Sequence, residues 1–131
     1  MKLLGKILLT GLLAGLSYQL FLGHRSDYLG HSMGGSGGTL LLLSLWFFIR
    51  RRLSGWSVLG LVLIAIGLGA VTESTIFKIA IFDPVDFFNQ SLGACMVGLC
   101  LLEEKNSPSL SAGMALVGFL FLVVGFTFAF A

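Results

Sequence analysis

The segment from Glu73 to Gly93, ESTIFKIAIFDPVDFFNQSLG, places a dense group of polar residues between two apolar runs. It contains three of the six carboxylates of a 131-residue chain that is 56% hydrophobic and only 11% charged. Asp83 and Pro84 predict a helix start, because aspartate is a favoured N-cap and proline suits the first helical position. The segment therefore predicts a tight hairpin between two helices, with its polar residues gathered at one end.

The apolar runs around this hairpin are long enough to cross a membrane. The mean hydropathy of the chain is +1.00, and a transmembrane helix needs about 20 mostly apolar residues. Five segments meet or nearly meet this length: residues 3–22, 30–49, 56–82, 84–102 and 110–130. We therefore expect an all-α membrane protein, a bundle of about five transmembrane helices, with residues 1–131 forming a single polytopic domain.

The basic residues predict the orientation of the bundle. If the N-terminus lies inside the cell, six of the eight basic residues face the cytoplasm: Lys2, Lys6, Arg50, Arg51, Arg52 and Lys105. Cytoplasmic loops are typically enriched in lysine and arginine, so we expect an N-in, C-out, multi-pass protein of the inner or plasma membrane. An arginine run can also bind nucleic acid, but at the boundary of an apolar segment it is typical of a topology anchor. No nucleic-acid partner is expected.

Glycines in the second apolar segment predict close helix packing. Gly30, Gly34 and Gly38 recur every four residues, and small residues at this spacing let a neighbouring backbone approach. An alternative is that residues 32–39 form a broken or re-entrant segment. The uncharged, phenylalanine-rich segment 110–130 is expected to face lipid or a partner protein.

The expected topology gathers ten polar residues on the outer half of the bundle: His24, Arg25, Asp27, His31, Glu73, Lys78, Asp83, Asp86, Asn89 and Gln90. Ionisable side chains at bilayer depth are costly, so they indicate a functional site by default. We expect a ligand-binding polar cluster of Asp27, His31, Glu73, Asp83, Asp86 and Gln90, with Arg25, Lys78 and Asn89 in secondary positions.

Some of these residues also have a structural interpretation. Asp83 and Asp86 can cap the helix that follows, and Asp27 can pair with Arg25 or orient the histidine four residues later. Glu73 differs, because at 1.5 Å per residue it lies about 13 Å from the end of segment 56–82. Helix capping does not explain a carboxylate at that depth.

Two patterns resemble catalytic or metal-binding sites but lack the necessary context. The sequence GHSMGG from Gly30 to Gly35 matches the nucleophile elbow, which needs a strand-to-helix turn and a later histidine, and no histidine follows Ser32. Serine hydrolysis is therefore not expected, although whether the chain is an enzyme stays open. The spacing of Asp27, His31, Glu73 and Asp86 is not that of a known metal site. No metal is expected, and no cofactor is indicated.

The polar residues resemble the pattern of the VanZ-like family of small membrane proteins. That family has a D-x-x-x-H pair, a later glutamate, a D-x-x-D turn and a following glycine. The chain matches this pattern at Asp27 and His31, Glu73, Asp83 and Asp86, and Gly93, so the resemblance covers about residues 26–98. It departs at Tyr28, Ile76 and Gln90, where the family has lysine, glutamine and asparagine.

The resemblance implies a cell-envelope protein, since the founding member of the family is associated with low-level resistance to the glycopeptide teicoplanin. It implies no reaction. The expected function is recognition of an envelope or lipid-linked ligand by the outward-facing polar cluster. The alternative is a non-catalytic accessory subunit of a larger membrane complex, with a membrane-protein partner or a second copy of the chain packed against it. A small proton-coupled transporter that uses Glu73 and His31 is the weakest interpretation.

Overall fold

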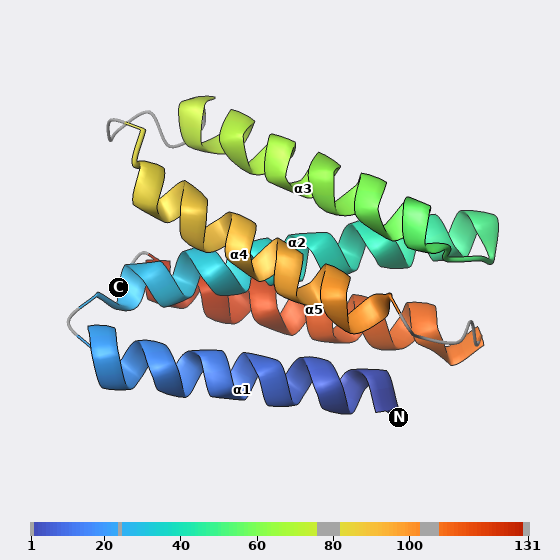
Figure 1. The fold of residues 1–131 in the computed structure, drawn as a ribbon, viewed down its shortest axis with the longest axis horizontal. Coiled ribbons are helices and arrows are strands. Elements are labelled where there is room, and N and C mark those ends of the chain that lie inside the picture. The colour runs from blue at the N-terminus through green and yellow to red at the C-terminus, as the bar shows by residue number, and fades with distance from the viewer. Residues whose placement is uncertain (1, 24, 76–81, 103–107, 130–131) are drawn as a thin grey trace.

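The computed structural model describes residues 2–23, 25–75, 82–102 and 108–129. It contains five α-helices in these ranges: α1 (Lys2–Leu22), α2 (Ser26–Arg50), α3 (Gly55–Thr75), α4 (Pro84–Leu101) and α5 (Pro108–Ala129). The helices run roughly along the long axis of one bundle (Figure 1). Four of them, α1, α2, α3 and α5, are long and apolar enough to cross a membrane. The chain therefore has the build of a helical membrane protein.

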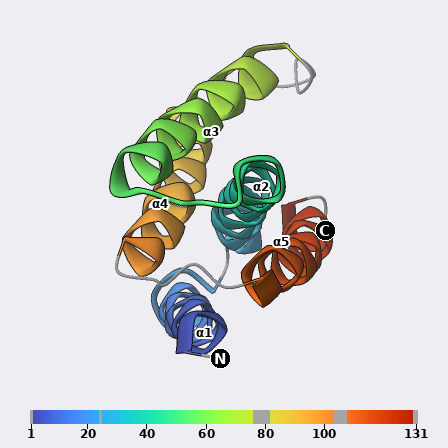
Figure 2. The same ribbon diagram turned by 90° about the vertical axis from the view of Figure 1, so that its right-hand side faces the viewer.

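Helix α2 is the central element of the bundle. It contacts all four other helices and lies between α5 on one side and the α3–α4 pair on the other (Figure 2). Half of its membrane-length segment is buried inside the bundle, compared with 22% for the segments of α3 and α5. Its Leu40 and Leu43 are completely buried and form a common core with Val97 of α4 and Met114 of α5. The core is therefore built around α2.

Glycines bring the backbone of α2 against that of α5. A Cβ atom on Gly30 would lie 2.4 Å from the backbone nitrogen of Ala129, and one on Gly37 would lie 2.7 Å from the carbonyl oxygen of Gly118. These approaches confirm that the glycine-rich half of α2 packs closely. A Cβ on Gly34 or Gly38 would meet nothing within 4 Å, so within the expected stripe of Gly30, Gly34 and Gly38 only Gly30 requires the absence of a side chain. The helix is continuous through residues 32–39, so the alternative of a broken segment is wrong.

The opposite face of α2 interlocks with α4. A Cβ on Gly93 of α4 would lie 2.0 Å from the carbonyl oxygen of Ser32, and a Cβ on Gly35 of α2 would lie 2.0 Å from the carbonyl oxygen of Gln90. Each helix thus places a backbone carbonyl where the other has no side chain. Because a side chain at either position would collide with backbone, the two glycines set the distance between α2 and α4.

Helix α5 is more deeply packed than its composition suggested. Leu110, Met114 and Val117 are buried against the core, whereas Phe119 and Phe126 are exposed. The expectation that the segment is only a lipid- or partner-facing wall is therefore wrong for one of its faces. The glycines of α5 explain the difference, since they allow contact with α2 that side-chain hydrophobicity alone does not reveal.

Helix boundaries near the polar residues differ from the expected ones. Helix α2 begins at Ser26 rather than near residue 30, which puts Asp27 in its first turn, where a negative charge is favoured. The described part of α3 ends at Thr75, and Phe82 is not helical. Glu73 lies two residues before the end of the described part of α3, so the described residues do not test its expected depth of about 13 Å. The remaining residues of the expected helix, 76–81, lie outside the described residues.

Candidate functional site

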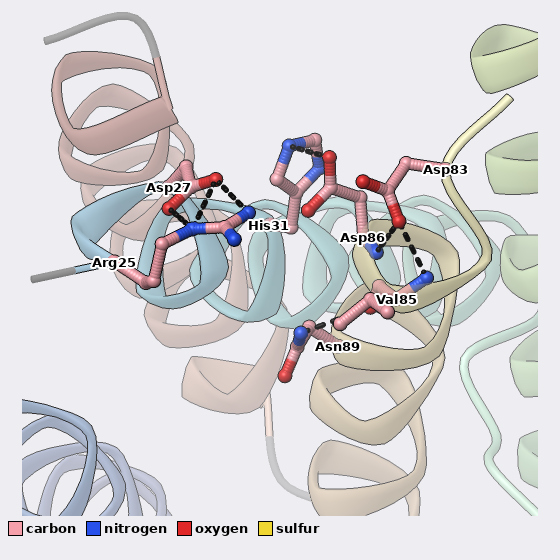
Figure 3. Close-up of polar contacts among 7 residues, drawn as sticks. All are labelled: Arg25, Asp27, His31, Asp83, Val85, Asp86 and Asn89. Atoms are coloured by element: carbon pink, nitrogen blue, oxygen red, sulfur yellow. Dashed lines mark hydrogen bonds and ion pairs between the residues drawn. The ribbon is translucent and has the colours of Figure 1, made fainter. Parts of the chain in front are cut away.

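Three helices bring ionisable side chains to one end of the bundle. The start of α2 supplies Arg25, Asp27 and His31, the start of α4 supplies Asp83 and Asp86 (Figure 3), and the end of α3 lies at the same end (Figure 1). The arginine run 50–52 lies at the opposite end of α2. The expectation that these residues share one end of the bundle is confirmed. His24 and Lys78, which were placed in the same group, lie outside the described residues.

His31 and Asp86 form the contact at the centre of this group. The Nε2 atom of His31 lies 3.4 Å from Oδ2 of Asp86, and the two side chains are only 19% and 15% exposed. The contact joins α2 to α4 and becomes an ion pair when the imidazole is protonated. The other carboxylate oxygen of Asp86, Oδ1, is buried and has no hydrogen-bond partner within the described part of the chain. A buried acceptor without a partner is costly, so this oxygen is available to a donor from outside the chain.

Glu73 belongs to the same group although it comes from α3. Its residue is only 6% exposed. Its carboxyl lies close to the backbone of Asp83 and within electrostatic range of His31 and Asp86. Two carboxylates from different helices, Glu73 and Asp86, are therefore within electrostatic range of one histidine, and Asp86 is the one in contact with it.

Asp27 pairs with Arg25 and not with His31. The guanidinium of Arg25 donates to both carboxylate oxygens of Asp27, from Nη2 at 2.9 Å and from Nε at 3.1 Å, and it lies 3.9 Å above the ring of Tyr28. The hydrogen bond to Asp27 raises the pKa of the Arg25 guanidinium above its ordinary value. Asp27 is therefore charge-compensated locally, and its predicted pairing with Arg25 is confirmed.

Asp83 is the N-cap of α4. Its side chain accepts hydrogen bonds from the backbone nitrogens of Val85 at 2.8 Å and of Asp86 at 3.4 Å, and Pro84 occupies the first helical turn. The capping interpretation is thus confirmed for Asp83. Asp86, in contrast, directs its side chain at His31 (Figure 3).

Gln90 lies one helical turn farther into the bundle than Asp86. A Cβ on Gly69 of α3 would lie 1.9 Å from Nε2 of Gln90, so the glutamine side chain occupies the space that this glycine leaves. Gly69 is itself four residues before Glu73. The facing sides of α3 and α4 therefore carry Glu73 and Asp86 near the end of the bundle. One helical turn farther into the bundle, the same sides carry the contact between Gly69 and Gln90.

Asn89 has a structural partner that the sequence did not indicate. The hydroxyl of Tyr18 in α1 donates to Oδ1 of Asn89, and Nδ2 of Asn89 donates to the carbonyl of Val85 at 2.9 Å. Asn89 is 6% exposed, and Ser32 of α2 lies beside the Tyr18 hydroxyl. The only signal in the sequence was Tyr18 itself, near the end of an apolar segment. Tyrosine is common at that position in membrane proteins without any such partner, because it is enriched at the membrane–water interface.

Replacing Tyr18 by phenylalanine should lower the free energy of unfolding by about 1–2 kcal/mol, because it leaves the buried Oδ1 of Asn89 without a donor. Reversible unfolding in mixed micelles, followed by circular dichroism, measures this change. Tyr28→Phe is the matched control, since Tyr28 contributes its ring to the Arg25 contact and phenylalanine keeps that ring. Equal stability of the two variants would show that the Tyr18 hydrogen bond contributes nothing.

The serine-hydrolase pattern has no matching geometry. The residues from Gly30 to Gly35 lie inside the continuous helix α2, and Ser32 is buried, whereas a nucleophile elbow presents its serine on a strand-to-helix turn. Within the described ranges, no group of three or more His, Cys, Asp or Glu side chains could hold a metal ion. What the site offers chemically is hydrogen-bond acceptance and negative charge.

Comparison of the chain with protein-family models, with curated proteins and with solved structures finds no match.

Proposed function

We propose that the chain is a VanZ-like, multi-pass protein of the inner or plasma membrane that binds an envelope or lipid-linked ligand at its outer end. In this proposal the N-terminus is cytoplasmic, and α4 crosses the membrane together with α1, α2, α3 and α5. The six-to-two distribution of basic residues supports the orientation. The observation that carries the proposal is the buried, unpartnered Oδ1 of Asp86 beside His31.

The charges of the cluster support a ligand with hydrogen-bond donors. Arg25 compensates Asp27, and Asp83 is occupied by the backbone of α4. Glu73 and Asp86 then remain as two largely buried carboxylates near a single histidine. Buried carboxylates are stabilised by hydrogen bonds or by positive charge, and an amine, amide or hydroxyl group of a ligand supplies one or both.

The VanZ-like resemblance rests on the same residues. Its D-x-x-x-H pair, its glutamate and its paired aspartates correspond to Asp27 and His31, Glu73, and Asp83 and Asp86, which come together at one end of the bundle. The resemblance extends the proposal to a role in the response to teicoplanin, because glycopeptides act on the wall side of the membrane.

The proposal is tested with Glu73→Gln and Asp86→Asn, made separately in cells that depend on this chain for teicoplanin tolerance. Each variant removes one negative charge and keeps the size of the side chain, so we expect tolerance to fall to the level of a deletion strain. Ser74→Ala is the matched control, since Ser74 is an exposed neighbour of Glu73 whose hydroxyl, within the described residues, donates to the backbone carbonyl of Ala70 in its own helix. Immunoblots of the membrane fraction give the abundance of each variant. Full tolerance in both variants at normal abundance would mean that the cluster is structural.

The accessory-subunit alternative is favoured by the loose packing of α1. Only 6% of the membrane-length segment of α1 is buried, and leucines such as Leu12 and Leu20 are exposed. Native mass spectrometry of protein purified in mild detergent separates the two functions. A small bound mass that disappears in Asp86→Asn supports the ligand site, whereas a stoichiometric protein partner in both wild type and variant supports the subunit.

A further inference from the structure

We propose that the end of the bundle opposite the polar cluster binds the phosphate headgroups of anionic membrane lipids through Arg50, Arg51 and Arg52. The inference is independent of the function proposed for the polar cluster. It depends on the aromatic residues that surround the arginines, on the absence of a counter-charge among the described residues, and on the depth at which this end lies.

Aromatic rings hold two of the guanidinium groups in place. The Cζ atom of Arg50 lies 5.5 Å from the centre of the Trp46 ring, and that of Arg51 lies 5.1 Å from the centre of the Phe48 ring. A guanidinium stacked on a ring keeps the N–H groups at its edge free to donate. Phe48 is 61% exposed, so the Arg51 contact lies on the outside of the bundle.

The three arginines have no anionic partner in the part of the chain that the structure describes. The two ion pairs found there are Arg25 with Asp27 and His31 with Asp86, both at the other end. Arg50, Arg51 and Arg52 are all exposed. Each guanidinium carries five N–H donors in a planar fork that fits a phosphate through two parallel hydrogen bonds. Three such groups in sequence favour an anionic partner with several phosphates, as in the surface of a bilayer.

The surrounding residues place the arginines at the depth of lipid headgroups. Helix α2 ends at Arg50, and Arg51 closes it in a left-handed conformation (φ 54°), with its N–H donating to the carbonyl of Phe47. The chain's two tryptophans, Trp46 and Trp56, lie on either side of the run, and Trp56 is 84% exposed. Tryptophan is enriched at the membrane–water interface. The arginines therefore lie where headgroup phosphates of the adjoining leaflet reach them, and each basic residue there adds to the attraction of anionic lipid.

The two tryptophans provide a direct test, because no other tryptophan lies elsewhere in the chain. The protein is reconstituted into vesicles of phosphatidylcholine and phosphatidylglycerol, with bromine on the acyl chains of one lipid at a time. Bromine quenches tryptophan fluorescence on contact, so the two quenching curves give the relative association constant of the lipids at this end. We expect phosphatidylglycerol to be preferred in the wild type. We expect each of Arg50→Gln, Arg51→Gln and Arg52→Gln to lower the preference by up to about fivefold, and the triple variant to abolish it.

Arg25→Gln is the matched control, since it removes one arginine from the opposite end and should leave the lipid preference unchanged. Circular dichroism in the same vesicles shows whether each variant keeps its helical content. Because both leaflets have the same composition, the direction of insertion does not affect the result. Equal quenching by the two brominated lipids in the wild type overturns the proposal. So does an equal loss of preference in Arg25→Gln, or displacement of brominated phosphatidylglycerol by inorganic phosphate, which would indicate a site for the free anion.

Discussion

Replacing Gly93 by alanine should lower the free energy of unfolding by about 3 kcal/mol, at the upper end of the usual range for overpacking. The added Cβ would lie 2.0 Å from the backbone carbonyl oxygen of Ser32 and 2.8 Å from Oγ of Ser36. Because the nearest atom belongs to the backbone, relief requires α4 to move away from α2. That movement would also separate Asp86 from His31, so the ligand binding proposed for the polar cluster should weaken together with stability.

The measurement is reversible unfolding in mixed micelles, with Gly38→Ala as the control in the facing helix. A Cβ on Gly38 meets nothing within 4 Å. Alanine is also favoured over glycine in a helix by up to about 1 kcal/mol, so this variant should be as stable as the wild type or slightly more stable. If Gly93→Ala matched Gly38→Ala in stability, the α2–α4 contact would not be as close as described.

Replacing His31 by alanine should cost about 2–4 kcal/mol, because it leaves the largely buried carboxylate of Asp86 without its partner. The value lies toward the lower end of what broken buried pairs cost, since both side chains keep some exposure. A double-mutant cycle with Asp86→Ala isolates the interaction from the packing lost in each single variant. We expect a coupling energy of about 1–2 kcal/mol, measured by unfolding in mixed micelles.

The Arg25–Asp27 pair is the internal comparison for this cycle. Its side chains are 39% and 36% exposed, and ion pairs at that exposure contribute about 0–1 kcal/mol. The same cycle with Arg25→Ala and Asp27→Ala should therefore give the smaller coupling energy. Equal values for the two cycles would mean that burial does not strengthen the His31–Asp86 contact.

The positions of the helices and the end at which the charges gather were predictable from local patterns. Apolar runs of membrane length indicated the helices, and Asp83 with Pro84 indicated the start of α4 with its N-cap. Grouping Glu73 with His31 and Asp86 followed from the alternation of chain direction between successive helices. The helix positions and the N-cap depend on residues near one another in the sequence. The end at which the charges gather depends only on helices of similar length that alternate in direction.

The partners of individual side chains were not predictable in the same way. The contact of Tyr18 with Asn89 joins residues 71 positions apart, and no local pattern specifies such a pair. The depth of α5 in the bundle also escaped prediction, because it depends on Gly118 and Gly125 meeting the glycines of α2. Hydropathy measures preference for lipid or protein over water, and it does not distinguish a lipid neighbour from a helix neighbour.

The interlocking glycines of α2 and α4 have a mechanical consequence for the polar cluster. Gly35 and Gly93 each receive a carbonyl of the other helix, so the two backbones meet directly at these points. Side chains change rotamer and so let helices slide, but backbone atoms in direct contact cannot adjust in this way. Helices α2 and α4 should therefore move as one rigid body that holds His31 opposite Asp86. Any hinge motion that accompanies occupation of the cluster would then be carried by α3, which brings Glu73 toward a fixed pair or takes it away.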